Sequence, residues 1–327
     1  MLQIGLNPYG LTYYLGLQGS GTPRANPNGR GLEGFITLAQ ELNAKTLEIF
    51  DPWLAKLSDA ELASLGHRLK ALGMTPVISA GLNMMGPVDS ALRSAKALDA
   101  KIIRLGLSPV LEGSRNAWGD KWRDLQTSIR AGLKTYAPQA NAQGVTLAIE
   151  NHQDFTSAEL AGFCDEFGPG VGITLDTGNT FPVGESPLDF TRRVAPYVKH
   201  VHLKDYRVQF SPEGFRLVRC AIGDGAVPFT DLIAILRQHH SSLTAVLEPG
   251  ALEARHIKLF TADWWQGYAP KSAQELAACL LAAQRNHIPE GEDYLTPWEK
   301  QQDGDALIAY ELAMIRRSAA NIALLTL

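Results

Sequence analysis

The sequence predicts an α/β protein that folds as a (β/α)8 TIM barrel with a helical extension at its C-terminal end. Short apolar runs of strand length alternate with longer segments of helical periodicity as far as about residue 284. The alternation contains eight strands, which favours a closed parallel barrel over an open doubly wound sheet. No GxGxxG or P-loop motif follows the first strand, which weakens the nucleotide-binding alternative.

Eight apolar runs are the expected strands. They lie at 3–7, 45–50, 75–80, 101–106, 145–150, 171–176, 198–204 and 244–248. Capping boxes mark the starts of several intervening helices, with Ser58 paired to Glu61 and Thr156 to Glu159. A further box at 272–275 opens a helix that we expect to end near residue 286.

Two longer segments stand apart from the alternation. Residues 206–228 exceed an ordinary loop between strand and helix, and long loops on the ligand face of a barrel are usually lids or specificity elements. A last helix is expected near 304–325. Its apolar face comprises Leu307, Ile308, Ala313, Ile315 and Ile322. We therefore expect a catalytic barrel domain at 1–285 and a C-terminal helical extension at 286–327, packed on the barrel or on a partner subunit.

The composition excludes several classes of protein. A net charge of −4 and a pI near 6.1 provide no excess positive charge to attract nucleic acid or an anionic membrane. No apolar stretch approaches the roughly 20 residues that a membrane span requires. Cys164, Cys220 and Cys279 are widely spaced and odd in number, which is typical of reduced thiols. The chain starts with a strand-like run rather than a leader, so we expect a soluble cytoplasmic protein.

Four of the expected strands end in a side chain that can bind a metal ion. Glu150, Asp176, His202 and Glu248 each follow apolar strand residues and are separated by 26, 26 and 46 residues. Strand side chains alternate between faces and adjacent strands lie about 4.8 Å apart, so the four side chains can converge at one end of the barrel. Three carboxylates and one imidazole suit one divalent cation, with Mn²⁺ as first choice and Mg²⁺ or Co²⁺ as alternatives. For each position alone, a helix cap or an ion pair is the structural alternative.

The residues around these positions form four short motifs. They read Leu147-Ala148-Ile149-Glu150-Asn151-His152, Leu175-Asp176-Thr177-Gly178-Asn179, His200-Val201-His202-Leu203-Lys204-Asp205 and Leu247-Glu248-Pro249. Together with residues 223–229 they resemble the xylose isomerase-like TIM-barrel superfamily. Within it they look like the sugar (phosphate) isomerase and epimerase branch, which includes ketose 3-epimerases and inosose isomerases. The resemblance covers about residues 1–250.

The resemblance implies a function for the two glutamates. Glu150 and Glu248 would bind the metal and stand on opposite faces of the substrate, so that one removes a proton next to a carbonyl and the other returns one. A divalent ion stabilises the enediolate formed on deprotonation. We therefore expect a metal-dependent isomerase or epimerase of a small ketose or ketose phosphate. The alternative is a lyase, either a decarboxylase or a dehydratase, acting on a 3-oxo sugar acid or a related keto-sugar at the same site.

Two positions depart from the ketose 3-epimerase pattern. Asn179 stands where those enzymes have histidine, and Val208 stands where they have a substrate-binding arginine, although the adjacent Arg207 could substitute. These departures argue against 3-epimerase activity and leave enediolate chemistry intact. The chain also lacks the additional ligands that a trinuclear zinc AP endonuclease needs. Its complete set of four ligands argues against a non-enzymatic sugar-binding role.

Four residues are candidate substrate contacts: Arg104, His152, Asn179 and Lys204. Arg104 and Glu48 should both point into the barrel, where a buried ion pair between them is the preferred interpretation. The alternative is that Arg104 binds a substrate carboxylate or phosphate. His152 could serve a loop instead, and Lys204 could be a solvated lysine at the rim.

The aromatic residues Trp53, Trp264 and Trp265 could wall a sugar pocket, although packing is the commoner role of such rings. His200 should lie one layer deeper than His202 and be a hydrogen-bonded core histidine. The expected partners are a small carbohydrate and, from the apolar face of the last helix, a second copy of the chain, but neither nucleic acid nor a membrane.

Overall fold

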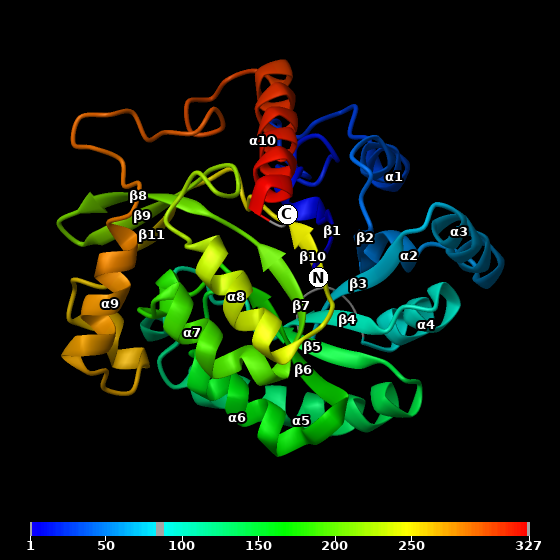
Figure 1. The fold of residues 1–327 in the computed structure, drawn as a ribbon, viewed down its shortest axis with the longest axis horizontal. Coiled ribbons are helices and arrows are strands. Elements are labelled where there is room, and N and C mark those ends of the chain that lie inside the picture. The colour runs from blue at the N-terminus through cyan, green and yellow to red at the C-terminus, as the bar shows by residue number, and fades with distance from the viewer. Residues whose placement is uncertain (1, 83–87, 326–327) are drawn as a thin grey trace.

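The computed structural model describes residues 2–82 and 88–325 and contains a closed barrel of eight parallel strands surrounded by helices (Figure 1). The order around the barrel is β1-β10-β7-β6-β5-β4-β3-β2. The strands are β1 (Leu2–Leu6), β2 (Thr46–Phe50), β3 (Thr75–Gly81), β4 (Ile102–Gly106), β5 (Thr146–Glu150), β6 (Val171–Asp176), β7 (Val198–Leu203) and β10 (Leu243–Leu247). Each expected strand is present with its ends within one residue, and the TIM-barrel prediction is confirmed.

Helices connect successive strands of the barrel. They are α1 (Gly31–Glu41), α2 (Asp51–Leu54), α3 (Asp59–Ala71), α4 (Val88–Leu98), α5 (Lys121–Ala142), α6 (Ser157–Phe167), α7 (Pro187–Val194) and α8 (Phe229–His239), followed after the last barrel strand by α9 (Ala273–Ala283) and α10 (Gly304–Leu325). The boxes that the sequence predicts at Ser58, Thr156 and Ser272 form reciprocal hydrogen bonds at the starts of α3, α6 and α9. Each cap satisfies amide groups that the first helical turn leaves without partners.

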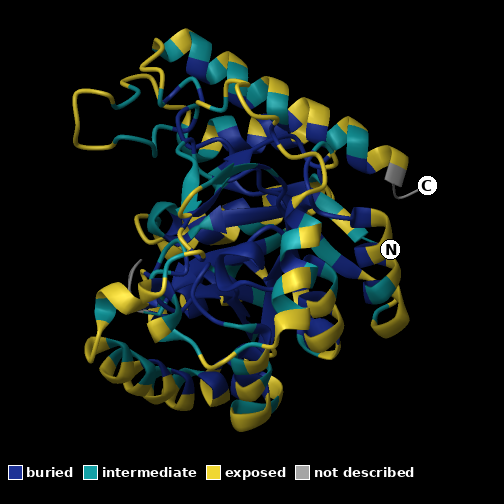
Figure 2. Cartoon of the chain, turned by 90° about the vertical axis from the view of Figure 1, so that its left-hand side faces the viewer, coloured by how far each residue is buried: buried dark blue, intermediate teal, exposed yellow. Residues whose placement is uncertain are grey.

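The core lies between the barrel and its ring of helices. Leu147 and Ile149 on β5, like Ile173 and Leu175 on β6, have no solvent exposure. Figure 2 shows the strands buried and the exposed residues gathered on the outward faces of the helices. Because strand side chains alternate, the same pattern that buries these apolar residues directs their neighbours into the barrel.

Residues 206–228, expected as a long loop, are instead partly a β-hairpin. It consists of β8 (Tyr206–Ser211) and β9 (Gly214–Arg219), and β11 (Arg255–Ile257) pairs with β9 as a third antiparallel strand. We call β8, β9 and β11 the rim sheet, because it continues from the C-terminal ends of β7 and β10 beyond the barrel (Figure 1). Gly214 has a φ of 153°, and a Cβ there would lie 1.9 Å from the carbonyl oxygen of Ile257. The close approach of β11 therefore requires glycine at this position.

Asp205 anchors the chain that follows the rim sheet. Its carboxylate accepts hydrogen bonds from the backbone amides of Tyr206 (3.0 Å), Gly223 (3.0 Å), Gly225 (2.8 Å) and Val227 (3.0 Å). A Cβ on Gly225 would lie 2.3 Å from Asp205 Oδ1. The glycine motif before α8 thus holds this segment against the end of β7.

Helix α10 packs on the barrel at β10. Leu307, Ile315 and Ile322 of the predicted apolar face are buried, and Ile308 is half-buried. The assignment of Ala313 to that face is wrong, because Ala313 is exposed on the solvent side of the helix. The domain boundary between residues 285 and 286 stays a prediction.

Among the helices within 2–82 and 88–325, none combines the length and apolar character that crossing a membrane demands. The three cysteines are buried and not bonded to one another.

Candidate metal centre and cavity

Glu150, Asp176, His202 and Glu248 come together at the C-terminal end of the barrel. They belong to β5, β6, β7 and the residue after β10, which are neighbours in the barrel. One ligand atom from each side chain lies within 4.8 Å of those of the other three. All four side chains are buried. The structure therefore brings together the whole set of ligands that the sequence predicts.

The two nitrogens of His202 face different groups. Its Nδ1 lies 3.0 Å from Glu150 Oε1 and 2.7 Å from Glu248 Oε2, whereas its Nε2 lies 2.6 Å from Glu48 Oε2. Burial disfavours the imidazolium, yet Glu48 and Glu248 raise the pKa of His202 well above its usual value. Both ring nitrogens therefore hold a proton in the absence of a cation. When a cation displaces the Nδ1 proton, Glu48 can hold the remaining proton on Nε2, which directs the lone pair of Nδ1 at the cluster.

His200 is the hydrogen-bonded core histidine that the sequence predicts. Its Nδ1 lies 2.7 Å from Thr244 Oγ1 and its Nε2 lies 3.0 Å from Glu48 Oε2. The predicted ion pair between Arg104 and Glu48 is wrong, because Arg104 instead pairs with Glu150. Strand β4 neighbours β5, so Arg104 reaches Glu150 directly. Strand β3 lies between β4 and β2, and Glu48 on β2 faces β7 across the barrel.

Lys204 also pairs with carboxylates of the cluster. Its Nζ lies 2.5 Å from Asp176 Oδ2 and 2.7 Å from Glu248 Oε1. Burial opposes the charge of Lys204, but Asp176 and Glu248 raise its pKa well above the usual value. The interpretation of Lys204 as a solvated rim lysine is therefore wrong, since its side chain is 4% exposed.

The cluster fits a divalent cation by its charge. It holds the four carboxylates of Glu48, Glu150, Asp176 and Glu248 against the two cations Arg104 and Lys204. With His202 neutral, two buried negative charges are left over, which one divalent ion would offset. Without an ion, the proton that the raised pKa of His202 retains offsets one of these charges. Uncompensated charge in a protein interior is costly, so this balance favours an ion at this place.

One buried oxygen supports the same conclusion. Among the residues that the structure describes, no group forms a hydrogen bond of ordinary geometry with Glu248 Oε2, although His202 Nδ1 lies 2.7 Å away. The separations of 2.7 and 3.0 Å from Nδ1 to the two glutamate oxygens are instead close to those between neighbouring ligands of one ion. Ligands about 2.1 Å from an ion at right angles to one another are about 3 Å apart.

The electrostatics of the cluster differ from one acid to the next. Burial works against the ionised form of Glu150, but Arg104 holds its pKa well below the usual value. Burial raises the pKa of Asp176 to about 7, although Lys204 opposes this effect. Burial lowers the pKa of His152 to about 4, so its imidazole is neutral at pH 7.

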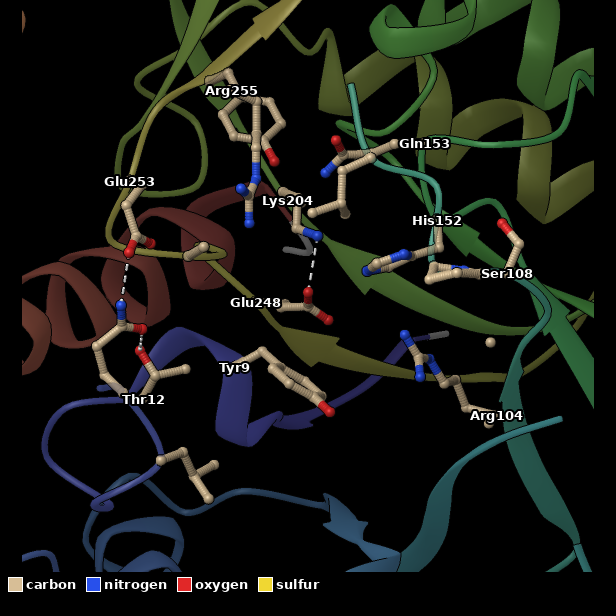
Figure 3. A pocket seen from close by; sticks show the side chains of 18 residues that line it. Tyr9, Thr12, Arg104, Ser108, His152, Gln153, Lys204, Glu248, Glu253 and Arg255 are labelled. Atoms are coloured by element: carbon tan, nitrogen blue, oxygen red, sulfur yellow. Dashed lines mark hydrogen bonds and ion pairs between the residues drawn. The ribbon is translucent and has the colours of Figure 1, made fainter. Parts of the chain in front are cut away.

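A cavity of about 360 Å³ borders the cluster (Figure 3). Glu248, Lys204, Arg104, His152 and Tyr9 all line it. The other three candidate ligands do not line it and have no solvent exposure. A small molecule in this cavity would therefore meet Glu248 first, with the remaining ligands behind it.

A family model described as xylose isomerase-like TIM barrel matches residues 36–264. The chain belongs to this family. The match covers more than half of the sequence and confirms the resemblance read from the strand-end motifs.

Two curated relatives are similar to this chain over part of its length. The uncharacterized protein YihM of Escherichia coli K12 is 26% identical over 184 residues, which are 56% of this chain and 54% of YihM. An inosose dehydratase of Lacticaseibacillus casei is 25% identical over 191 residues, which are 54% of this chain and 57% of that enzyme. The chain thus matches only a little over half the length of these relatives.

Among solved structures, an L-ribulose 3-epimerase superposes with a TM-score of 0.56 at 15% identity, covering 99% of this chain and 94% of the other. At that identity the likeness concerns the fold alone.

One candidate substrate residue, Asn179, and the possible substitute Arg207 lie elsewhere than expected. Asn179 is fully buried and does not line the cavity, and its Nδ2 donates to Asp176 Oδ2 at 2.7 Å. Its short side chain orients Asp176 instead. Arg207 does not replace the missing epimerase arginine, because it points to the backbone carbonyls of Asn286 (3.4 Å) and His287 (3.5 Å).

The predicted tryptophan wall is also wrong. Trp53, Trp264 and Trp265 do not line the cavity. Trp264 stacks on Tyr268, with ring centroids 4.4 Å apart, and is buried. These rings pack the protein interior, which is the commoner role of aromatic side chains.

The cavity-wall residues that sequence reasoning missed include Tyr9, Tyr206 and Arg255. The alternation of apolar and polar residues from Tyr206 onward is a strand signal that could have placed Tyr206 on the inner face of a hairpin. Strand β11 has only three residues, so no periodic pattern could have revealed the position of Arg255.

Proposed function

We propose that this protein is a divalent-metal-dependent isomerase or epimerase of a small ketose or ketose phosphate. The observation that carries the proposal is the convergence of three carboxylates and one imidazole beside a cavity of about 360 Å³. Cavities of this size suit small ligands. Mn²⁺ is the first choice, with Mg²⁺ or Co²⁺ as alternatives, because the donor set is rich in oxygen. Bound there, such an ion would polarise a carbonyl and make the adjacent C–H more acidic.

Glu248 is the proposed base. It lines the cavity, and its Oε1 is held by Lys204. A carboxylate on the cavity wall can take a proton from a substrate carbon. Lys204, through the same contact, is proposed to orient Glu248 and to reach a substrate oxygen.

Glu150 is the proposed partner that returns the proton. Both of its oxygens are bonded, one to Arg104 and the other to His202, and it lies behind the cavity wall. Proton return by Glu150 therefore requires Arg104 to move toward the substrate. His152, a neutral imidazole on the cavity wall, is the alternative carrier.

A lyase is the second candidate. Asn179 and Val208 stand in place of the histidine and the arginine of the ketose 3-epimerase pattern, and one of the relatives is an inosose dehydratase. The same cation, base and proton carrier would serve loss of water or CO₂ from a keto-sugar or 3-oxo sugar acid. A cytoplasmic location and self-association stay predictions.

Proton exchange in D₂O tests the proposal and separates the two reactions. The protein is incubated with Mn²⁺ and panels of ketoses, ketose phosphates and oxo-sugar acids, and NMR follows deuterium incorporation next to the carbonyl. Isomerisation or epimerisation conserves the carbon skeleton and its oxygens, whereas a lyase releases water or CO₂. Glu248→Gln should lose the metal-dependent exchange, while Glu166→Gln, an exposed glutamate of α6, should retain it. Undiminished metal-dependent turnover by Glu248→Gln would contradict the proposed role.

A further inference from the structure

The rim sheet has one face turned toward the barrel mouth, and this face is almost entirely apolar or aromatic. Strand register and alternation place on it Tyr206, Val208, Phe210, Phe215, Leu217, Arg219, Arg255 and Ile257. Val208, Phe215, Leu217 and Ile257 have no solvent exposure. The two arginines are the exceptions, and a charge on a buried face needs a partner.

Arg219 has its partners within the protein. Its Nη2 donates to the carbonyl oxygen of Gly10 at 2.9 Å, and its Nη1 lies 3.9 Å from Glu311 Oε1. Arg255 differs, because within residues 2–82 and 88–325 its guanidinium forms neither a hydrogen bond nor an ion pair. Arg255 lines the cavity, and Figure 3 shows its guanidinium pointing into it on the side of Lys204 and Glu248.

The other two side-chain cations on the cavity wall are already engaged. Arg104 pairs with Glu150, and Lys204 pairs with Asp176 and Glu248. Arg255 therefore supplies the positive charge on this wall that protein carboxylates do not neutralise. A ligand that touches both Glu248 and Arg255 would extend along one cavity of about 360 Å³.

We propose that Arg255 binds an anionic group of the substrate, a carboxylate or a phosphate, while the carbonyl end of the substrate lies at Glu248. The inference rests on the proposed function and narrows the substrate class to anionic carbohydrates. A guanidinium presents parallel N–H donors that match both oxyanions. Tyr206 adds a hydroxyl on the same wall, and burial raises its pKa to about 12, so it remains a hydrogen-bond donor at neutral pH.

Glu253 is the acidic side chain beside this part of the cavity. Its Oε1 accepts a hydrogen bond from Gln18 Nε2 at 2.8 Å, and Gln18 in turn accepts one from Thr12 Oγ1 at 3.2 Å (Figure 3). This chain of contacts ties Glu253 to the segment after β1. Glu253 is held by a neutral amide and, among the described residues, forms no ion pair with Arg255, so the guanidinium stays available for a ligand.

Titration calorimetry with Mn²⁺ present tests the proposal. The probes are D-gluconate for a carboxylate, D-fructose 6-phosphate for a phosphate and D-fructose as the neutral sugar. Arg255→Met should weaken binding of the preferred anionic probe by at least about tenfold, because a charged hydrogen bond is lost. It should leave D-fructose binding within about twofold. Arg255→Lys should retain part of the affinity, and the probe that responds identifies the anion.

Arg216→Met is the matched control, because it removes the same charge from the opposite face of the same sheet. It should leave the affinity for both anionic probes unchanged. Equal affinity of the wild-type protein and Arg255→Met for both anionic probes, including no binding by either protein, would overturn the proposal. An equal loss of D-fructose binding would overturn it as well. Arg255→Gln supplies the same comparison if Arg255→Met melts at a lower temperature.

This experiment is independent of turnover. If the anionic probes bind through Arg255 and no metal-dependent proton exchange occurs, the proposed reaction fails and the anion site stands. If exchange occurs with neutral ketoses and Arg255 has no effect, the reaction stands and the anion site fails.

Discussion

Glu48 controls the orientation of His202 although it is not among the four converging ligands. Its Oε2 contacts Nε2 of both His202 (2.6 Å) and His200 (3.0 Å), and its Oε1 accepts from Asn7 Nδ2 at 2.9 Å. Histidines that bind metals commonly donate their other N–H to a carboxylate, which fixes the tautomer and the ring position. Glu48 is therefore a positioning residue for the candidate metal centre.

Glu48→Gln should weaken Mn²⁺ binding by about 10- to 100-fold, the usual effect of losing such a partner. The reason is that a neutral amide supports the basicity of His202 less well and removes one of the buried negative charges. Titration calorimetry with Mn²⁺ measures the change. Glu311→Gln removes a buried carboxylate outside the cluster and should bind Mn²⁺ as the wild type does. Wild-type affinity in Glu48→Gln would show that Glu48 does not position His202.

The raised pKa of Asp154 predicts that the stability of the protein depends on pH. Burial raises its pKa to about 7, although Ser108 donates a 2.6 Å hydrogen bond to its Oδ2. Because the pKa is higher in the folded chain, the stabilisation from the protonated acid is complete below the unfolded pKa near 4 and is lost as the pH rises through 7. Relative to Asp154→Asn, the wild type should lose roughly 4 kcal/mol of unfolding free energy between pH 4 and pH 8.

Urea denaturation of both proteins across this range measures the difference. The exposed Asp120→Asn variant is the control and should follow the wild-type curve. Parallel curves for wild type and Asp154→Asn would mean that folding does not raise the pKa of Asp154.

At the scale of elements, the barrel could be predicted because its strands and helix caps carry local signals. Runs such as Leu147–Glu150 alternate between faces, and the capping boxes at Ser58, Thr156 and Ser272 need only residues three apart. The convergence of the candidate ligands could be predicted because the C-terminal ends of the strands share one rim of the barrel.

The elements that the sequence did not reveal depend on contacts between distant segments. Strand β11 exists because Arg255–Ile257 pairs with β9 about forty residues earlier, and three residues show no period. The partner of Arg104 depended on which strands are adjacent across the barrel and on which side chains reach the axis. Neither the adjacency of strands nor the reach of a side chain can be derived from the spacing of residues along the sequence.

The segment held by Asp205 gives a prediction at this scale. Gly225→Ala should destabilise the protein by about 2 kcal/mol or more, because its Cβ would lie 2.3 Å from Asp205 Oδ1 and 2.5 Å from the Tyr206 carbonyl oxygen. Gly162→Ala is the control, since it lies exposed in α6 with no atom within 4 Å of an added Cβ. It should be neutral or stabilise by up to about 1 kcal/mol. Chemical denaturation of both variants checks the contrast, and equal effects would refute it.

At the scale of the whole molecule, α10 joins the end of the chain to its beginning. Glu311 Oε1 accepts from Tyr13 N at 3.0 Å, and its Oε2 accepts from Tyr14 N at 2.8 Å. The neighbouring residues Thr12 and Gln18 line the cavity. The last helix therefore supports one wall of the cavity from the outside of the barrel.

Glu311→Gln should lower the unfolding free energy by about 1–3 kcal/mol, because one of its backbone amide partners loses an acceptor. Thermal and urea denaturation measure this loss. Unchanged stability would mean that the contact between α10 and the segment after β1 contributes nothing to the fold.

A crystal structure of the protein grown with Mn²⁺, with an anomalous difference map, tests the central claim most directly. We expect one strong peak about 2.1 Å from the side chains of Glu150, Asp176, Glu248 and His202 Nδ1. Glu48 should remain on Nε2 of His202. A map with no peak among these residues, or with the ammonium of Lys204 still bonded to both Asp176 and Glu248 and manganese bound elsewhere, would contradict the account.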